Sequence, residues 1–290
     1  MIGWIAGGAG VCLAALAGFW KAAANSQRPR LLPNEASPEA VYENVTFRSG
    51  NETLRGWLLQ PANERENPWP TVIIAHGWGS NRSRVLRYTK PLMEAGYAVF
   101  MFDARSHGDS DAVAAPSGFM FRDDVEAAVA AASRQPGVDP TRIAVLGHSL
   151  GGFGALLAYG RGLPVKAVVT DSSPLRFETM IRSELKRRKL PFFPLGILIP
   201  KVWLARAHIS RKEAKSTDVP AWIRRNHEGE RRPLFMVHSL RDGYVDPGDL
   251  RAVTEQVPIE HLFVNAPGHS CSETDPDFWP AVLSFMRKHL

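Results

Sequence analysis

Residues 147–151, Gly-His-Ser-Leu-Gly, have the form G-x-S-x-G and lie between an apolar run and a helical stretch. A serine on a sharp strand-to-helix turn has a strained backbone, and glycines beside it leave room because they carry no side chain. Such a turn exposes the hydroxyl at the carboxyl edge of a sheet, where ligands bind in open α/β folds. We therefore take Ser149 as the candidate nucleophile. Without partners, an ordinary glycine-rich turn would explain the motif equally well.

A serine hydroxyl is a weak nucleophile and needs a neighbouring base. Of the nine histidines, His269 is the best candidate, because it follows the last predicted strand in a Pro-Gly loop that can place an imidazole over the nucleophile. The alternative is that it is a solvated loop residue. His238 ends an apolar strand and is expected to be buried, and His208 and His227 lie in a segment without a supporting strand.

An imidazole base needs a carboxylate that fixes its tautomer and stabilises its charged form. Two aspartates, Asp242 and Asp246, follow the predicted strand that ends at Val237. Asp246 precedes Pro247 and a helical stretch, which is the pattern of a helix N-cap. Asp242 has no such structural role and lies closer to the strand, so we assign it as the acid that orients the histidine.

The oxygen of a tetrahedral intermediate needs N–H donors aimed at it. One is expected from the backbone of Leu150, because this residue follows the nucleophile at a helix N-terminus. The second is expected from residues 76–79, His-Gly-Trp-Gly, with the backbone N–H of Trp78 as the donor. The alternative for this loop is a tight turn that only leads away from a strand.

These loops need a sheet that brings them to one edge. Thr71–Ala75 is a continuous apolar run, typical of a strand covered on both faces, and strands and helices alternate after it. This alternation predicts an α/β fold with a mainly parallel central sheet flanked by helices. A hairpin over Glu43–Arg48 and Leu54–Leu59 is expected before it. The further predicted strands are 97–102, 142–146, 165–170, 234–237 and 261–264, and the predicted helices are 84–95, 123–134, 151–159, 247–256 and a last helix ending at Leu290.

The alternation stops at residues 175–232, a segment too long for a plain loop. We interpret it as a helical lid inserted into one domain over residues 41–290. It holds 15 Lys and Arg against 6 Asp and Glu, and the basic run Lys186–Lys189 precedes an apolar, proline-broken stretch, Leu190–Pro200. The lid either lines an acyl pocket or touches a lipid interface with its basic run on anionic head groups, or it covers the domain's own apolar surface.

The positive charge of the chain is local rather than general. The net charge is +6, but residues 175–232 alone contribute +9, so the rest of the chain is slightly acidic. Nucleic acid is therefore not an expected partner. The sequence shows neither a zinc-ligand spacing nor a phosphate-binding loop, and we expect no metal and no cofactor.

Residues 1–24 are predicted as an N-terminal transmembrane anchor, followed by a linker over residues 25–40. Ile2–Trp20 carries no charged side chain and as a helix would span about 28 Å, close to the thickness of a bilayer core. The nearest basic residues all follow this run, which by the positive-inside tendency places the catalytic domain on the cytoplasmic side. A cleaved signal peptide is the alternative, although no basic residue precedes the run.

Together, these motifs resemble those of the α/β-hydrolase superfamily, and within it the bacterial serine-aminopeptidase-like and monoglyceride-lipase-like hydrolases. The similarity covers roughly residues 45–175 and 230–290, and the order Ser, Asp, His along the chain is that of this fold. Ser106 and Ser239 stand where glycine is usual. The motifs that carry the resemblance are His76-Gly77, residues 103–110, residues 147–151, Asp242 with Val245, and Gly268-His269.

The predicted reaction is a two-step acyl transfer to water, in which Ser149 forms an acyl-enzyme and water activated by His269 releases the acid. We expect a small-molecule carboxylic ester as substrate, lipid-like esters included. A peptidase, an amidase, a thioesterase or an acyltransferase would use the same residues. Outside the enzymes, the alternative is a membrane-tethered binding protein that keeps the fold without turnover, and the intact Ser, Asp, His set argues against it.

Overall fold

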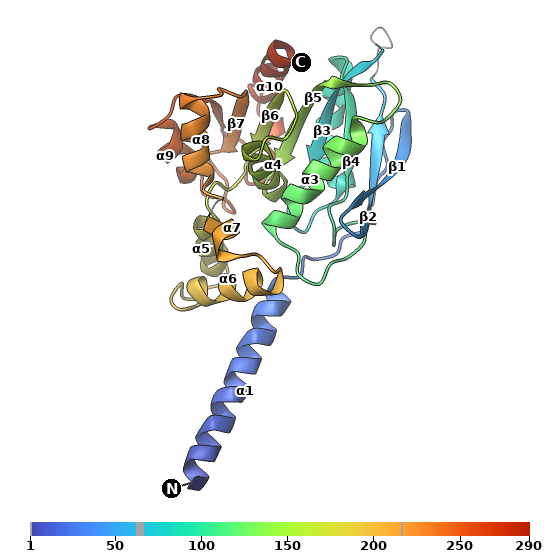
Figure 1. Ribbon diagram of the computed structural model, residues 1–290. Coiled ribbons are helices and arrows are strands. Elements are labelled where there is room, and N and C mark those ends of the chain that lie inside the picture. Colours follow the sequence, from blue (N-terminus) through green and yellow to red (C-terminus); the bar gives the residue numbers. More distant parts are fainter. Residues whose placement is uncertain (1, 62–66, 216) are drawn as a thin grey trace.

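The centre of the molecule is one mixed sheet (Figure 1). The computed structural model describes residues 2–61, 67–215 and 217–290, with side chains from residue 13 onward. Within these residues the sheet has eight strands in the order β1-β2-β4-β3-β5-β6-β7-β8. The strands are β1 (Tyr42–Ser49), β2 (Glu52–Leu59), β3 (Trp69–Ala75), β4 (Ala98–Phe102), β5 (Val138–His148), β6 (Ala167–Asp171), β7 (Leu234–Ser239) and β8 (Glu260–Val264).

This sheet confirms the predicted α/β fold with a mainly parallel sheet. β1 and β2 form the expected antiparallel hairpin, β2 also pairs antiparallel with β4, and the pairings from β4 to β8 are parallel. β4, β6 and β7 are buried along their whole length, which explains why their sequences are apolar without alternation. The carboxyl ends of the parallel strands share one edge, so the residues that follow them are brought together there.

Helices cover both faces of the sheet and bury two apolar layers. The helices concerned are the 3-10 helices η1 (Arg82–Tyr88) and η2 (Ser272–Thr274), and α2 (Thr89–Glu94), α3 (Gly118–Ala132), α4 (Leu150–Gly160), α9 (Gly248–Thr254) and α10 (Phe278–His289). Phe121 of α3, Leu156 of α4 and Leu250 of α9 belong to one layer. Leu92 of α2 and Phe285 of α10 belong to the other. Burial of this apolar surface is the main favourable contribution to folding.

α3 begins earlier than predicted, at Gly118 rather than at Asp123. Its start is fixed by Ser117, whose hydroxyl accepts a hydrogen bond from the backbone N–H of Met120 at 3.2 Å. A serine at this position is a favoured N-cap, because it satisfies an amide that has no partner within the helix. The first turn of α3 is thereby held against α4, where Gly118 lies close to the ring of Phe153.

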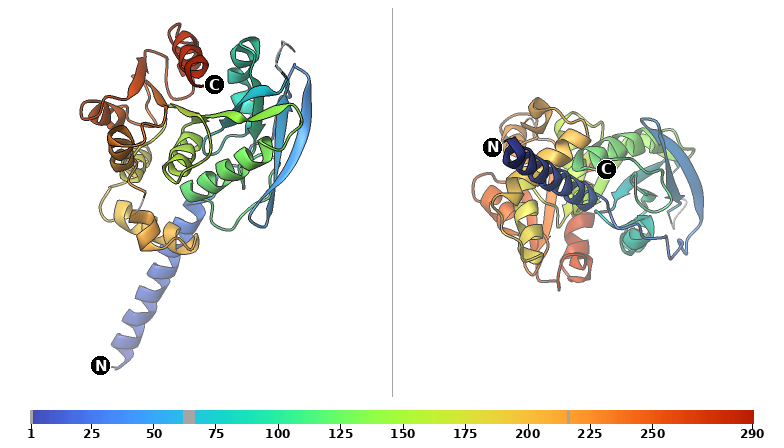
Figure 2. Two further views of the ribbon diagram at one scale, coloured as in Figure 1. Left: turned by 45° about the horizontal axis from the view of Figure 1, so that its top comes forward. Right: turned by 90° about the horizontal axis from the view of Figure 1, so that it is seen from below.

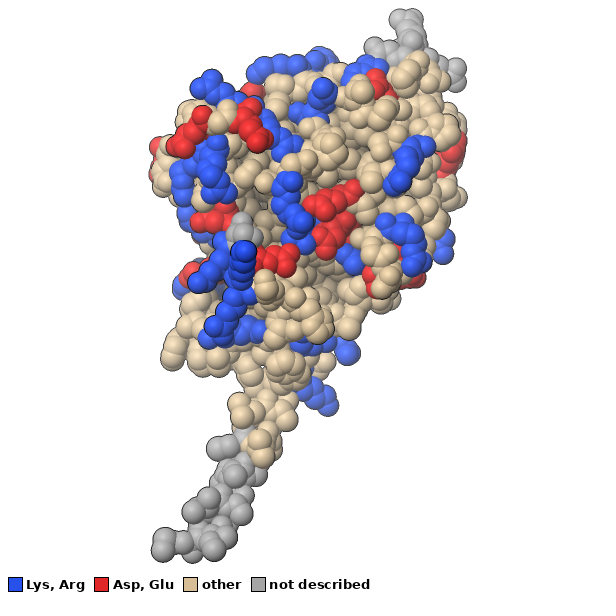
Figure 3. Space-filling view, in the orientation of Figure 1, with Lys and Arg blue, Asp and Glu red and all other residues tan. Residues whose placement is uncertain are grey.

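The segment between β6 and β7 contains four helices joined by loops among the described residues. Its helices are α5 (Phe177–Arg187), α6 (Leu195–Arg206), α7 (Arg211–Lys215) and α8 (Val219–Glu228). Val219 and Ile223 of α8 pack into the apolar layer beneath α3 and α4. By contrast, Ile197 and Leu198 of α6 are exposed. Figure 3 shows Lys and Arg side chains gathered over α7 and α8, consistent with the basic composition of this insertion.

The N-terminal segment is a helix, α1 (Ile2–Ser26), that extends away from the sheet (Figure 1; Figure 2). Across the part of the chain that the structure describes, no helix has both the length and the apolar character needed to cross a membrane. The predicted transmembrane anchor is therefore wrong, and the cytoplasmic placement that depended on it is withdrawn. Of the predicted span Ile2–Trp20, only the part from Leu13 onward is described with side chains, and that part is too short to cross a bilayer core. The side chains of residues 2–12 lie outside the described residues.

The last turn of α1 is fixed to α6 of the insertion. The indole Nε1 of Trp203 donates to the carbonyl oxygen of Ala23 at 2.8 Å, and Ala23 is buried. Arg206 donates to the carbonyl oxygen of Ala24 at 3.3 Å and to the side chain of Gln27 at 2.6 Å. The end of α1 is therefore part of the packed body.

The predicted linker, residues 25–40, contacts the body through Asn34. Its amide nitrogen donates to the carboxylates of Asp103 and Asp109 at 2.8 and 2.9 Å. Both carboxylates also bind Arg82, which forms a buried ion pair with Asp103 and a 2.6 Å ion pair with Asp109. This network joins the N-terminal segment to the loops that follow β3 and β4. The domain boundaries at residues 24 and 40 stay predictions.

Replacing Arg82 with methionine leaves the buried carboxylate of Asp103 without its counter-charge. Burial already raises the pKa of Asp103, and Arg82 opposes that rise. We expect R82M to lower the free energy of unfolding, measured in urea, by about 3 kcal/mol at pH 7. This loss of stability should shrink at acid pH, because Asp103 is then protonated and no longer needs a counter-charge. A carboxyl group whose pKa is raised by folding stabilises the folded state only while it is protonated. The exposed Arg84 of the same helix offers a matched control, and R84M should cost less than about 0.5 kcal/mol. Equal losses of unfolding free energy in R82M and R84M would show that the buried carboxylate of Asp103 does not depend on Arg82.

Candidate active site

Ser149 lies on the sharp turn between β5 and α4, with φ +53° and ψ −123°. This is a left-handed conformation that a residue with a side chain rarely adopts. The turn is tight because α4 starts directly against the sheet: a Cβ on Gly147 would lie 2.4 Å from the Cα of Gly152. One on Gly151 would lie 2.3 Å from the carbonyl oxygen of Ala75. The glycines of the G-x-S-x-G motif are thus required by the backbone contacts that hold the serine in place.

The structure brings Ser149, His269 and Asp242 together. The Nε2 atom of His269 lies 2.9 Å from the Oγ atom of Ser149, and its Nδ1 atom lies 2.7 Å from Oδ2 of Asp242. The three side chains follow β5, β8 and β7, whose carboxyl ends share one edge of the sheet. The carboxylate cannot donate, so Nδ1 carries a proton, and Nε2 is free to accept the hydroxyl proton when the ring is neutral.

Asp242 is held as a buried carboxylate. Its side chain has no exposed surface. Burial tends to raise its pKa, but hydrogen bonds from His238 and His269 and from the backbone N–H of Val245 together hold the pKa well below its ordinary value. The Asp242 carboxylate is therefore ionised near neutral pH. A negative charge beside Nδ1 stabilises the imidazolium that forms when His269 takes up a proton.

Of the other candidates from the sequence, His238 contacts this cluster, with its Nε2 atom 3.3 Å from Oδ2 of Asp242. Asp246 accepts a hydrogen bond from the backbone N–H of Gly248 at 2.8 Å, so it supports the start of α9. His208 and His227 lie in the insertion, and His238 is buried as expected.

The two predicted backbone donors flank the serine. Leu150 is the first residue of α4, and a Cβ on Gly77 would lie 2.9 Å from the Cβ of Ser149, so the loop that contains Trp78 is adjacent to the hydroxyl. Among the described groups, neither the amide of Leu150 nor that of Trp78 has a hydrogen-bond acceptor. An unpaired amide at a helix N-terminus is available to an anionic oxygen.

His76 shapes the loop that carries Trp78. Its Nδ1 atom lies 2.8 Å from the carbonyl oxygen of Gly77, and its Nε2 atom accepts from the backbone N–H of Ala104 at 3.0 Å. Nδ1 is therefore the protonated nitrogen. Burial lowers the pKa of His76 to about 4, so the ring is neutral near pH 7. The His-Gly pair of the sequence motif thus fixes the loop rather than supplying an acid or base.

A second buried network lies behind the nucleophile turn. The hydroxyl of Tyr88 donates to Asp171 at 2.5 Å, and Nδ1 of His148 lies 3.3 Å from the same carboxylate. Burial lowers the pKa of His148 to about 4. Burial opposes ionisation of Asp171, but bonds from His148, Ser272 and Tyr88 lower its pKa to about 2. The ring of His148 lies 5.0 Å from that of His269, so this network packs directly under the base.

Two side chains beside His269 were not predicted from the sequence. The ring of Tyr244 stacks on the imidazole, with centroids 5.4 Å apart and planes 22° from parallel. Arg187, from α5 of the insertion, donates to the Tyr244 hydroxyl and lies 4.4 Å over the Tyr244 ring. The only sequence signal was that Tyr244 lies two residues after Asp242. Arg187 belongs to a run of four basic residues, and the sequence gives no sign of which of them contacts Tyr244.

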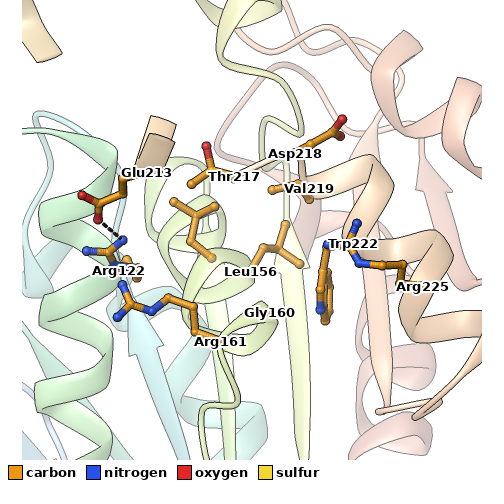
Figure 4. Close-up of a pocket in the computed structure, with 11 residues that line it drawn as sticks. Arg122, Leu156, Gly160, Arg161, Glu213, Thr217, Asp218, Val219, Trp222 and Arg225 are labelled. Carbon is orange, nitrogen blue, oxygen red and sulfur yellow. Dashed lines mark hydrogen bonds and ion pairs between the residues drawn. The ribbon is translucent and has the colours of Figure 1, made fainter. Parts of the chain in front are cut away.

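A hollow of about 190 Å³ lies elsewhere, between the outer part of α4 and helices α7 and α8 (Figure 4). Leu156, Val219 and Trp222 line it, and Arg122 at its side is engaged by Glu213 at 2.9 Å. It contains no residue of the Ser149 cluster. Within the described residues, no group of three or more His, Cys, Asp or Glu side chains is placed to hold a metal ion.

This fold and this serine turn define an α/β hydrolase. The family model described as serine aminopeptidase, S33 matches residues 66–211, half of the chain, and the chain belongs to this family. It is 31% identical over 154 residues to the uncharacterized protein YfhR of Salmonella typhimurium, covering 49% of this chain and 52% of YfhR. The chain thus spans about half the length of the curated relatives it matches.

Solved structures share the fold over most of the chain. The esterase Pf2001 of Pyrococcus furiosus matches with a TM-score of 0.68 at 24% identity, over 90% of this chain and 99% of that chain. Est1E of Butyrivibrio proteoclasticus, in a structure with bound ferulic acid, matches with a TM-score of 0.63 at 22% identity, over 84% and 98% of the two chains. At these identities the likeness establishes the fold alone.

Gly151 has no room for a side chain. A methyl group there meets the carbonyl oxygens of Ala75 and His76 at 2.3 and 2.4 Å, and backbone cannot move aside cheaply. We expect Gly151→Ala to lower the free energy of unfolding by about 2 kcal/mol, measured by urea denaturation. Gly243 has open space around its Cβ position and no positive φ, so Gly243→Ala should be nearly neutral. Tolerance of alanine at residue 151 would show that α4 is not pressed against β3 as described.

Proposed function

We propose that this protein is a serine hydrolase that cleaves a carboxylic ester through an acyl-enzyme on Ser149. The observation that carries the proposal is the position of the His269 ring, whose two nitrogens lie 2.9 Å from the Ser149 hydroxyl and 2.7 Å from the Asp242 carboxylate. A neutral imidazole in this position removes the hydroxyl proton as the serine attacks a carbonyl carbon. Asp242 then stabilises the imidazolium.

The reaction continues with the same three groups. His269 returns its proton to the leaving alcohol oxygen, and the acyl group remains on Ser149. Water then enters, and its oxygen attacks the acyl carbon as His269 removes a proton from it. The resulting tetrahedral intermediate collapses as His269 returns that proton to the Ser149 oxygen, which releases the acid and restores the serine hydroxyl. In both steps negative charge develops on the former carbonyl oxygen. The backbone amides of Leu150 and Trp78 are proposed to donate to it, which lowers the barrier because they are already oriented.

An ester is the proposed substrate for two reasons. An alcohol is a better leaving group than an amine, so an ester is the less demanding substrate for this mechanism. The structures of similar fold include the Pyrococcus furiosus esterase Pf2001 and Est1E with ferulic acid. These likenesses support ester cleavage here as a proposal, and lipid-like esters are included in it.

Active-site labelling tests the assignment of the nucleophile. We expect a fluorophosphonate probe to label the native chain and to leave Ser149→Ala unlabelled, because phosphonylation needs an activated serine hydroxyl. Ser149→Ala should also lower kcat/KM for p-nitrophenyl butyrate by at least about a thousandfold. A folded Ser149→Ala variant that keeps its label and its hydrolysis would reject the proposal.

A substrate panel separates ester cleavage from the other reactions of such a site. Aryl esters of increasing acyl length and aminoacyl amides, assayed side by side, are expected to give kcat/KM values at least tenfold higher for the best ester. Faster cleavage of the amides would replace the ester assignment by peptidase activity, with the Ser149 mechanism unchanged.

We further propose that the insertion acts as a lid over the site. Arg187 at the end of α5 contacts Tyr244, and Tyr244 stacks on His269, so the insertion reaches the catalytic base through two side chains. The loop after α5 leaves Phe193 74% exposed, so this part does not pack onto the domain. An exposed apolar side chain of this size on a tethered helical segment is consistent with a lid that contacts an apolar substrate.

Arg187 and Arg188 provide a matched pair for testing the lid. Both form ion pairs with Glu184, but of the two only Arg187 is in contact with Tyr244 among the described residues. We expect Arg187→Gln to raise KM for p-nitrophenyl butyrate about three- to fivefold, because a cation–π contact at an exposed site is lost. Arg188→Gln should change KM less than twofold. Equal effects would mean that the charge of α5, and not its contact with Tyr244, matters.

A further inference from the structure

Asp242 is in contact with a second imidazole besides that of His269. We propose that His238 is a positioning residue, which holds the Asp242 carboxylate in the orientation that His269 needs. The inference rests on the proposed function, because it concerns how the same site is assembled. His238 does not contact Ser149 in any described interaction, so it acts through Asp242.

The contacts of His238 fix the position of its proton. The side chain is buried at the end of β7, and its Nε2 atom lies 3.0 Å from the carbonyl oxygen of Val245 and 3.3 Å from Oδ2 of Asp242. Both neighbours are acceptors. Nε2 must therefore carry a proton, which it shares between the loop backbone and the carboxylate.

This bond completes the set of donors around Asp242. Oδ1 accepts from the backbone N–H groups of Tyr244 and Val245 at 2.7 and 2.9 Å. Oδ2 faces His269 and His238. A carboxylate has about four lone-pair positions, so each is matched by one donor. Because the Asp242 side chain has no exposed surface, water cannot take the place of His238.

The bond also decides how the carboxylate charge is divided. Oδ2 serves two imidazoles, and the one that belongs to His238 withdraws part of its negative charge from His269. Removing that donor leaves more charge facing His269, which favours the imidazolium. It also frees one oxygen to turn away from the best angle for the bond to Nδ1, which slows the reaction. A histidine that only braced the loop through Val245 would produce neither effect.

Two substitutions with side chains of similar length separate orientation of Asp242 from bracing of the loop. His238→Gln places an amide N–H near the position of Nε2, whereas His238→Met fills the space without a donor. We expect H238M to lower kcat for p-nitrophenyl butyrate about tenfold, in keeping with loss of a hydrogen bond to a charged group, with KM nearly unchanged. H238Q should retain most of the native kcat. Unfolding in urea and fluorophosphonate labelling establish that both variants are folded.

The pH profile of kcat/KM gives a readout that a purely structural role would not move. In H238M the acid limb should shift to higher pH, because the imidazolium of His269 is more stable. Among the described residues, His269 is faced by the Ser149 hydroxyl, the Asp242 carboxylate and the rings of Tyr244 and His148, and the charged Arg187 lies over the Tyr244 ring. Burial keeps the pKa of His148 at about 4, so it does not titrate in the range where the limb is measured.

The outcomes distinguish this inference from the function it rests on. If Ser149→Ala keeps full activity, the serine mechanism fails and His238 has no catalytic group to position. If Ser149→Ala is inactive while H238M has native kcat and a native pH profile, the function stands and the role of His238 is rejected. Equal losses in H238M and H238Q without a shifted limb would also reject it.

Discussion

The arrangement of the site depends on one imidazole that bridges a hydroxyl and a carboxylate. His269 lies 2.9 Å from Ser149 and 2.7 Å from Asp242, and both distances are set by loops that follow different strands. A base 120 residues from its nucleophile can be placed this accurately only by rigid elements. The parallel sheet supplies them, because strand ends at one edge hold the loops in a fixed order. The strained turn at Ser149 then aims the hydroxyl at the ring, and the glycines around it let α4 approach closely enough to maintain that turn.

Three buried carboxylates near the strand ends each have hydrogen-bond donors or a counter-charge beside them. Asp242 faces two imidazoles and two amides, Asp171 faces Tyr88 and His148, and Asp103 faces Arg82. Each carboxylate would be costly in an apolar interior without these donors. The rings of His76 and His148, by contrast, are neutral near pH 7, since burial lowers the pKa of each to about 4. Negative charge is thereby concentrated beside His269, where an imidazolium must be stabilised.

The insertion between β6 and β7 relates to this rigid centre in two ways. α8 is anchored in the apolar layer through Val219 and Ile223, whereas the loop before α6 leaves Phe193 exposed. Arg187 of α5 contacts Tyr244, and Tyr244 stacks on His269, so the insertion is connected to the base. The end of α1 is bonded to α6 through Trp203. The insertion is thus held at α6 and α8, while Phe193 in the loop before α6 stays exposed.

The amino-acid sequence by itself determined the features that depend on local pattern. The hairpin and the buried strands follow from apolar periodicity, and Ser149, Asp242 and His269 were selected because each follows a strand with a motif suited to one chemical role. The start of α3 was predicted too late, because the alanine-rich stretch is a stronger helix signal than the single N-cap Ser117. The predicted membrane anchor is contradicted, because no helix of the described residues is both long and apolar enough to cross a membrane.

Only the tertiary structure decided which side chains meet. His238 was expected to be buried, but its contact with Asp242 depends on how the loop after β7 folds back. Tyr244 and Arg187 meet across 57 residues, and four neighbouring basic residues offered no local reason to choose Arg187. Periodicity reports which face of an element is buried, since neighbours along the chain share that face. It carries no information about the partner on another element, because that contact is fixed by packing of the whole domain.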